Sequence, residues 1–229
     1  MTSMDFQLAA TRWDDEYRQG RYAGERPLPF VSQVVSILAD HPSAAVKPGL
    51  YVGCGNGRNL LPLVDAGLDL YGLDISAEAV KLLGDQRPTI APRLTCGDFR
   101  AYHADQPFGY IVAIQVFQHG TFSDAETYFR KTTDLLMSGG LLFVRVNSIA
   151  TQIYQAHTVI ESTPLGGTTI RYEEGPKRGL LIHFYSLDEL TALSHTTLRP
   201  IIAPQERLIK RAAPKTGHWA QWEAIWQKA

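Results

Sequence analysis

A loop with three glycines, Gly53-Cys-Gly-Asn-Gly57, constrains the fold of this chain more than any other feature of the sequence. The loop follows the short apolar run at residues 50–52 and precedes a helix-like stretch over residues 58–66. Glycines at a strand-to-helix turn let the backbone bend sharply and let a ligand approach the main chain. The start of the following helix offers free N–H groups and the positive end of the helix dipole, which favour a phosphate or a carboxylate. The pattern therefore predicts a ligand-binding strand–loop–helix unit.

The same alternation of short apolar runs and helical patterns continues to residue 146, which is typical of a parallel sheet with helices on both faces. Ser76 is placed to cap the helix that follows the second strand. Ser123-Asp-Ala-Glu126 predicts a capping box that opens a helix to about residue 137. The sequence thus indicates a doubly wound α/β fold, with further strands expected over residues 70–74, 93–97, 110–116 and 141–146.

The regular alternation of apolar runs and helical patterns ends after residue 146. Residues 148–178 hold two polar stretches and a Gly-Gly turn, and we interpret them as an insertion, or lid, over the ligand-binding edge of the sheet. Residues 180–185 are another strand candidate, and Ser186-Leu-Asp-Glu189 predicts a second capping box. The tail with Trp219, Trp222 and Trp226 fits either an antiparallel hairpin or a helix, and periodicity alone does not decide between them.

The first 45 residues precede the first strand. They contain an aromatic-rich helix candidate around Trp13 and Tyr17 and a second helix over about residues 30–39. No linker rich in Gly, Ser or charge separates a second domain, so we expect residues 1–229 to form one domain, with residues 1–45 as an N-terminal cover.

Composition narrows the class of protein. The chain has 229 residues and a formal charge of −1, so no overall field draws it to nucleic acid or to anionic lipid. No apolar run reaches the ~18 residues that a membrane span needs, and the first residues lack the pattern of a secretory signal. Two cysteines cannot build a disulfide framework, and no acid/His cluster has metal-ligand spacing. We expect a cytoplasmic enzyme without a metal.

Asp74 strengthens the prediction of a nucleotide-like ligand. It ends the second predicted strand, 17 residues after Gly57, where an acid accepts hydrogen bonds from ribose hydroxyls. A dinucleotide fingerprint would need a third glycine at position 58, where this chain has Arg58, and the Lys-Ser/Thr of a phosphate-binding P-loop is absent. A nicotinamide-type oxidoreductase is therefore the weaker alternative.

The G-x-G-x-G form of the loop resembles motif I of the class I S-adenosylmethionine-dependent methyltransferases. The resemblance implies a Rossmann-like, seven-stranded, mostly parallel sheet with an antiparallel C-terminal strand, and S-adenosylmethionine as cofactor. It implies that the glycine loop cradles the methionine part of the cofactor, that Asp74 holds the ribose and that Ile75 packs on the adenine. The other residues that it assigns to the cofactor are Cys54, Asn56, Gly97, Asp98, Phe99, Gln115 and Val116.

Two residues depart from the family pattern. Tyr51 stands where the family commonly has an acid two positions before the first glycine, and Gly109 stands where an Asp often opens the fourth strand. Neither change removes the glycines or Asp74, so the resemblance to the methyltransferase family holds. Tyr51 is still expected to contact the cofactor.

The N-terminal segment resembles the aromatic lead-in of thiopurine-, thiol- and tellurite-type small-molecule methyltransferases. The similar residues are Trp13-Asp-Asp-Glu-Tyr17, Gly20, Pro27 and Pro29-Phe30. The resemblance implies that Trp13 folds over the cofactor and that Tyr17 and Tyr22 face the methyl acceptor. The alternative is an amphipathic helix that covers one sheet edge.

His119 is the candidate catalytic base, because it follows the fourth strand at the edge where such folds bind ligands. A structural role before Gly120 is the alternative. Tyr154, His157 and Arg171 lie in the insertion and are candidates for the acceptor pocket, although each is also typical of an ordinary surface residue.

The leading hypothesis is methyl transfer to an O, N or S nucleophile of a small molecule, by a monomer or a homodimer. An RNA- or protein-directed methyltransferase is the runner-up, but the chain has no added basic module. Gln115-Val-Phe-Gln118 replaces the Pro-Pro-aromatic tetrapeptide of enzymes that methylate nucleic-acid amino groups. A catalytically silent cofactor-binding protein is the third possibility, for which Tyr51 gives mild support.

Overall fold

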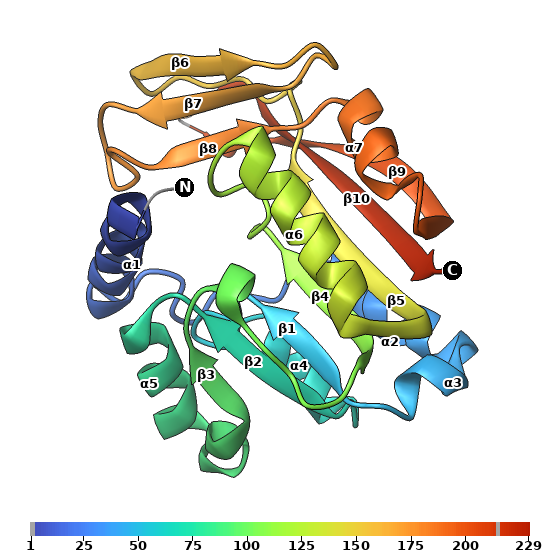
Figure 1. Cartoon of the computed structure of the whole chain (residues 1–229). Coiled ribbons are helices and arrows are strands. Elements are labelled where there is room, and N and C mark those ends of the chain that lie inside the picture. Colours follow the sequence, from blue (N-terminus) through green and yellow to red (C-terminus); the bar gives the residue numbers. More distant parts are fainter. Residues whose placement is uncertain (1–2, 214–215) are drawn as a thin grey trace.

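The computed structural model describes residues 3–213 and 216–229, with side chains from residue 7 onward. Its main sheet has seven strands in the order β3-β2-β1-β4-β5-β10-β9 (Figure 1). The strands pair in parallel except β10, which runs antiparallel to both β5 and β9. This is the α/β sheet with an antiparallel C-terminal strand that the sequence predicted. Its strands are β1 (Gly49–Val52), β2 (Leu70–Asp74), β3 (Leu94–Cys96), β4 (Phe108–Ile114), β5 (Leu136–Asn147), β9 (Leu198–Lys210) and β10 (His218–Lys228).

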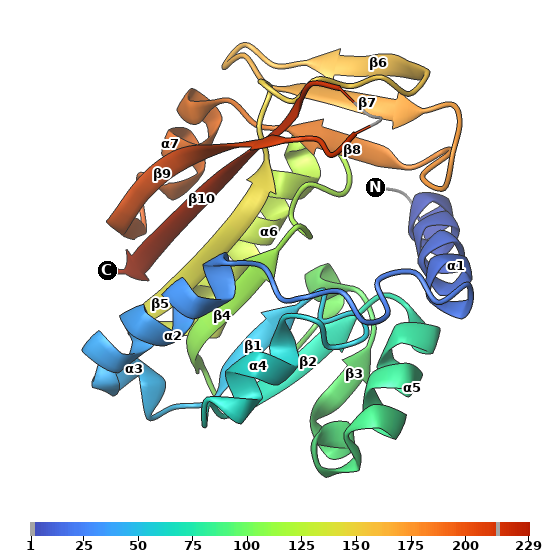
Figure 2. The same cartoon turned by 180° about the vertical axis from the view of Figure 1, so that it is seen from behind.

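Helices cover both faces of the sheet. One face carries α2 (Phe30–Asp40), α3 (Pro42–Ala45) and α4 (Leu60–Asp65), as Figure 2 shows, and the other carries α6 (Phe122–Leu135) and α7 (Leu187–Ser194). The helix α5 (Ala77–Gln86) packs against β2 and β3, and α1 (Ser3–Arg18) contacts α5. Two short 3₁₀ segments span Pro88–Arg93 and Phe99–Ala101. None of the described helices is long and apolar enough to cross a membrane.

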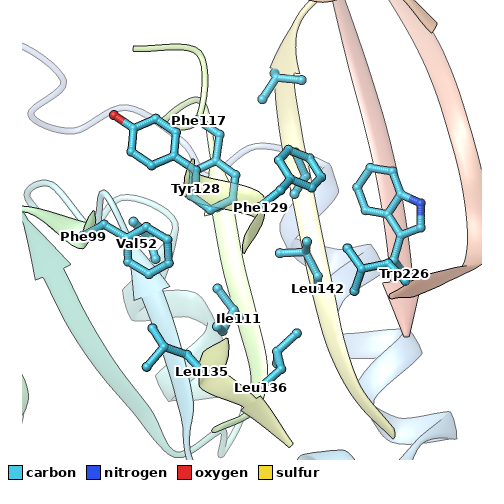
Figure 3. Close-up of a cluster of buried hydrophobic side chains, with 14 of the residues drawn as sticks. Val52, Phe99, Ile111, Phe117, Tyr128, Phe129, Leu135, Leu136, Leu142 and Trp226 are labelled. Carbon is cyan, nitrogen blue, oxygen red and sulfur yellow. The ribbon is translucent and has the colours of Figure 1, made fainter. Parts of the chain in front are cut away.

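Aromatic side chains fill the core between α6 and the sheet (Figure 3). Phe117 stacks on Tyr128 with ring centroids 5.2 Å apart, and it also stacks on Phe99 at 5.5 Å. Phe129 meets the edge of Trp226 from β10 at 5.8 Å. Every residue of β4 is buried, as expected for a central strand covered on both faces. The core thus fixes the segment after β4 against both α6 and the 3₁₀ segment that follows β3.

The start of α6 differs from the prediction. Thr121, not Ser123, is the N-cap: its hydroxyl accepts from the backbone N–H of Asp124, and the Asp124 carboxylate accepts from the backbone N–H of Thr121 at 2.9 Å. Asp124 at the third helical position closes a capping box as a Glu would. The capping box at Ser186 of α7 and the N-cap at Ser76 of α5 are confirmed.

Gly109, the departure at the start of the fourth strand, has a packing reason. A Cβ at this position would lie 2.0 Å from the carbonyl oxygen of Ala44 in α3. The close approach of α3 to β4 therefore leaves no room for any side chain at residue 109.

The tail is a hairpin, not a helix. β9 and β10 pair antiparallel over almost their full lengths, and β10 also pairs with β5. The indole N–H of Trp222 donates to the carbonyl oxygen of Tyr185 at 3.0 Å, and Trp226 is buried in the core. Pairing on both sides decides the tail's conformation, which periodicity alone left open.

The segment after β5 forms a second, three-stranded antiparallel sheet, here called the small sheet, of β6 (His157–Ser162), β7 (Thr168–Tyr172) and β8 (Leu181–Phe184). The predicted insertion therefore reaches further than residue 178, because the strand candidate at residues 180–185 pairs with β7. Backbone hydrogen bonds from Gly120 to Leu181 and from His183 to Gln118 tie β8 to the segment after β4. The small sheet thus lies over the ligand-binding edge of the main sheet, close to α1 (Figure 1).

A largely buried polar network fixes the small sheet to α7. His183 and Glu189 are both 0% exposed, and the His183 Nε2 lies 3.1 Å from a Glu189 carboxylate oxygen. The other imidazole nitrogen of His183 is hydrogen-bonded to the Thr169 hydroxyl at 2.8 Å, and the Thr163 hydroxyl donates to Glu189 at 2.5 Å. Burial alone would raise the pKa of Glu189, but its hydrogen bonds, led by that of His183, outweigh burial and lower the pKa.

Candidate active site

The glycine loop is fastened to the end of β2. The backbone N–H groups of Gly53 and Cys54 both donate to the carbonyl oxygen of Leu73, at 2.8 and 3.1 Å. The Asp74 carboxylate accepts from the backbone N–H of Gly55 at 2.7 Å and from that of Ser76 at 2.9 Å. Gly53 and Gly55 have φ values of +70° and +53°, which side chains rarely allow. The loop and the acid therefore form one rigid unit.

Burial sets the charge state of Asp74, which is only 6% exposed. Burial raises the pKa of Asp74 to about 6, although the hydrogen bonds from Ser76 and Gly55 work in the opposite direction. The carboxylate thus faces too few donors to compensate fully for its desolvation. A ligand with vicinal hydroxyls would supply further donors at this point.

A cavity of about 430 Å³ opens beside this unit. One wall consists of the glycine loop and of segments that follow β2, β3 and β4. The opposite wall consists of α1, the small sheet and the β9–β10 hairpin. Among the predicted cofactor residues, those that line the cavity are Trp13, Gly53, Cys54, Gly55, Asn56, Asp74, Ile75, Gly97, Asp98, Phe99, Gln115 and Val116.

Backbone strain marks the end of β4. Gln115 has φ +58°, one of two non-glycine residues with positive φ in the described chain, and its N–H donates to the carbonyl oxygen of Arg145 at 2.7 Å. The other, Tyr22 with φ +66°, also lines the cavity. Strained backbone of this kind persists only where the surroundings enforce it, and it gathers at functional sites.

One face of α1 forms a wall of the cavity. Ala9, Trp13 and Tyr17 recur every four residues, and all three line the cavity. A Cβ at Gly55 would collide with the Tyr17 hydroxyl, so α1 packs directly on the glycine loop. Asp14 docks the helix, because its carboxylate accepts from the hydroxyl of Ser76 at 2.6 Å and from the backbone N–H of Glu78 at 3.0 Å.

His119 lines the same cavity, with its ring edge-on to Trp13 at 5.3 Å between centroids. Burial, followed by the nearby charge of Lys177, lowers the pKa of His119 to about 3, while a hydrogen bond to the Gln115 backbone opposes the shift. The Tyr128 hydroxyl donates to the backbone carbonyl of His119 at 2.9 Å. Trp13 and the Gln115 backbone contact the imidazole, which is neutral at physiological pH, and Tyr128 holds the backbone of His119.

Two of the predicted cofactor residues lie outside the cavity lining. Tyr51 points from β1 into the core under α2 and α4 and is 1% exposed, because successive side chains of a strand face opposite sides of the sheet. Gly57, with φ +89°, packs beneath the loop, where a Cβ would meet Leu83 and Leu61. Both residues therefore support the loop from the core side.

Three of the predicted acceptor residues also lie outside the lining, whereas Tyr17 and Tyr22 belong to it. Tyr154 is 57% exposed and packs under the guanidinium of Arg211. His157 is exposed on the edge strand β6, and Arg171 is exposed on β7, where it pairs with Glu173 at 3.4 Å. The insertion does reach the cavity, but through other residues.

The residues that the small sheet and β10 contribute to the opposite wall were missed from sequence. Tyr172, the neighbour of Arg171, points inward from β7, and Lys177 reaches the cavity from the turn between β7 and β8. Trp219 and Gln221 enter from β10. The buried–exposed alternation Ile170, Arg171, Tyr172 was the one available signal, since it separates the two faces of β7.

The residues present fit S-adenosylmethionine. The backbone at Gly53 and Gly55 approaches the cavity without side chains, Asp74 offers a carboxylate short of donors, and Ile75 and Phe99 add apolar surface. Asp98 is hydrogen-bonded to Arg100, whose Nε lies 2.8 Å from it, so it enters the site as part of an ion pair. Within the described residues, no cluster of three or more His, Cys, Asp or Glu could hold a metal ion.

Comparison with known proteins identifies a domain within the chain. Residues 50–144 match the sequence model of the methyltransferase domain family. No curated protein sequence matches the chain. The matched segment contains the glycine loop, Asp74 and Gln115.

Solved structures share the fold. The 1,6-didemethyltoxoflavin-N1-methyltransferase of Burkholderia thailandensis, solved with bound S-adenosylhomocysteine, has a TM-score of 0.66 at 17% identity, over 100% of this chain and 92% of that one. The magnesium protoporphyrin IX methyltransferase of Synechocystis, with bound S-adenosylmethionine, has a TM-score of 0.63 at 13% identity, over 96% of each chain. The CcbJ methyltransferase of Streptomyces caelestis has a TM-score of 0.61 at 17% identity, over 89% and 91%. Residues 50–144 therefore match a methyltransferase domain, and the chain as a whole shares the fold of S-adenosylmethionine-dependent methyltransferases.

Proposed function

We propose that the chain methylates an O, N or S nucleophile of a small molecule, with His119 as the proton acceptor. The observation that carries the proposal is that His119, held against Trp13, lines the same cavity as the glycine loop and Asp74. The cavity lies between α1, the small sheet and the main sheet, which suits a small molecule better than a polymer. The formal charge of −1 also gives no general attraction to nucleic acid.

The main task of the site residues is to align the methyl donor with the methyl acceptor. The glycine loop and Asp74 would hold S-adenosylmethionine, which would supply an activated methyl group on a sulfonium for the lone pair of the acceptor. Asp74 and the loop orient the donor side, and α1 together with the small sheet excludes water from the other side. We place both covers within one domain over residues 1–229, with the small sheet as the lid.

The state of His119 limits the nucleophile. The neutral imidazole can accept a proton at pH 7, but a pKa near 3 makes it a weak base. It suits an acceptor whose own proton is already acidic, such as a thiol, an acidic phenol or a heterocyclic N–H. An aliphatic alcohol would need a stronger base.

Calorimetric titration with S-adenosylmethionine, S-adenosylhomocysteine and NAD(P)H tests the cofactor side first. Micromolar binding of the first two, and none of the third, is expected. Release of S-adenosylhomocysteine is then measured with thiols, phenols and N-heterocycles, and with RNA and peptides. Cofactor binding without turnover on any acceptor would make the chain a silent binder, and turnover only on RNA or peptides would contradict the proposal.

His119→Asn separates catalysis from binding. The variant should lower turnover at least tenfold and leave the affinity for S-adenosylhomocysteine within twofold, because the base is needed only while the acceptor loses its proton. His157→Asn is the control, since His157 lies outside the cavity. Equal activity of the two variants would remove His119 from the mechanism.

A further inference from the structure

Lys177 differs from the other cations of the cavity. Arg58 pairs with Glu25 at 2.7 Å, Arg145 with Glu223 at 2.8 Å, and Arg100 with Asp98 and Asp124. All three line the cavity beside Lys177. Among the residues whose side chains the structure describes, no carboxylate or other acceptor lies within bonding distance of the Lys177 ammonium. Within that described part of the chain, Lys177 is therefore a cation of the cavity that no carboxylate neutralises.

The charged residues near Lys177 do not supply its ammonium with a counter-charge. Among the residues with described side chains, Glu16 is the one acid whose charge raises the pKa of Lys177, and it is already paired with Arg21 at 2.9 Å. Burial lowers the pKa of Lys177, the charge of Arg21 lowers it further, and Glu16 only opposes the shift. A desolvated ammonium without a counter-charge is costly, and an anion brought by a ligand would remove that cost.

The position of Lys177 assigns it to the acceptor side. It comes from the turn between β7 and β8, which packs on α1: a Cβ at Gly179 would lie 3.2 Å from the side chain of Leu8. The glycine loop, Asp74 and the segments after β3 and β4 form the other wall. His119 lines the same cavity, and the charge of Lys177 contributes to lowering the pKa of His119.

Three aromatic side chains line the same cavity as Lys177. Trp13 comes from α1, Tyr172 from β7 and Trp219 from β10, and all three line it. The Arg211 guanidinium packs over the Trp219 ring at 3.8 Å and holds that ring in place. Rings in this arrangement favour a flat, conjugated ligand, because stacking and edge contacts need an aromatic partner.

On the basis of the proposed function, we propose that the methyl acceptor is a planar aromatic or heteroaromatic anion. Its carboxylate or comparable oxyanion binds the Lys177 ammonium, and its ring lies among Trp13, Tyr172 and Trp219. The anion also complements the positive sulfonium on the other wall. Lys177 is thus the residue that selects charged over neutral acceptors, and His119 acts on the nucleophile of the same ring system.

Binding of 2-naphthoate and its neutral isostere 2-naphthamide tests this selection without requiring turnover. Both probes are titrated calorimetrically into the full-length protein, with and without saturating S-adenosylhomocysteine. We expect at least tenfold preference for naphthoate. Lys177→Met should weaken naphthoate at least tenfold, leave naphthamide within twofold and leave S-adenosylhomocysteine unchanged. Lys177→Arg should retain part of the preference.

Arg178→Met is the matched control, because Arg178 lies on the same turn but does not line the cavity. It should keep the full preference. Equal binding of the two probes, no saturable naphthoate binding up to 10 mM, or an unchanged preference in Lys177→Met would each overturn the inference. A tenfold loss of S-adenosylhomocysteine affinity in Lys177→Met would instead assign the lysine to the cofactor carboxylate. Failure of the proposed function is distinct, since it appears as absent cofactor binding or absent turnover in the unmodified protein.

Discussion

The Asp74 carboxylate accepts a hydrogen bond of 2.7 Å from the backbone N–H of Gly55, across 19 residues of sequence. The acid that should hold the ribose is therefore also the residue that shapes the glycine loop. Loss of its side chain affects both the direct contact and the shape of the neighbouring loop.

Asp74→Ala should weaken binding of S-adenosylhomocysteine by roughly 1.5–3 kcal/mol, the range for hydrogen bonds to a charged group. Calorimetric titration measures the change directly. Asp105→Ala, which removes an exposed acid, should bind like the unmodified protein. Unchanged affinity in Asp74→Ala would refute the ribose assignment.

Cofactor affinity should depend on pH through the same carboxylate. Burial raises the pKa of Asp74 to about 6 in the free protein, and ribose hydroxyls would donate to the charged form and lower that pKa on binding. The cofactor therefore favours ionised Asp74, so affinity should be constant above about pH 7 and about tenfold weaker at pH 5. Titrations at the two pH values measure this change, and Asp74→Asn should show almost no dependence. An affinity that rises towards low pH would contradict the assigned sign.

Asp14 should control the docking of α1. Its carboxylate holds Ser76 and Glu78, so Asp14→Ala should loosen the helix that carries Trp13 over the cavity. We expect about tenfold weaker cofactor binding, equivalent to the loss of one to two hydrogen bonds. Asp15→Ala is the control, because Asp15 only pairs with Arg18 on the surface. Faster proteolysis within α1 of the Asp14 variant gives a second readout, and equal behaviour of the two variants would show that α1 is held by other contacts.

The buried network of Glu189 should contribute strongly to stability. Glu189→Ala leaves His183 and Thr163 without their partner, and removing one member of a buried pair typically costs about 3–5 kcal/mol. Urea unfolding should show this loss. Asp188→Ala, at the exposed neighbouring position, should change the free energy of unfolding by less than about 0.5 kcal/mol. A change in Glu189→Ala as small as that in Asp188→Ala would contradict the prediction.

The two faces of β7 should respond differently to substitution. Tyr172→Ala removes an aromatic wall of the cavity and should raise the KM for the acceptor about tenfold, as expected for the loss of a large buried side chain. Arg171→Ala changes the exposed face and should leave kcat/KM within twofold. Steady-state kinetics with the best acceptor measure both values. A larger kinetic effect of Arg171→Ala than of Tyr172→Ala would place the acceptor on the outer face of the small sheet.

Much of the fold could be predicted because its signals are local. The glycine loop, the apolar strands and the serine caps of α5 and α7 each depend on residues within one turn or one strand, so periodicity and capping chemistry reveal them. The cap of α6 was misplaced by two residues because an Asp closes its capping box. Tyr51 was expected at the ligand, but its place in β1 directs the side chain into the core.

The sequence by itself determined one wall of the cavity, from Gly53 to Asp74 and on to Gln115, because the carboxyl ends of neighbouring parallel strands must meet at one edge of the sheet. Only the tertiary structure decided the part of the opposite wall that the small sheet and β10 form. The alternation within β7 separates Arg171 from Tyr172, but the face that meets the cavity depends on how β8 docks onto the segment after β4. Lys177 lies in a turn without periodicity, so its place in the cavity lining follows from that docking alone.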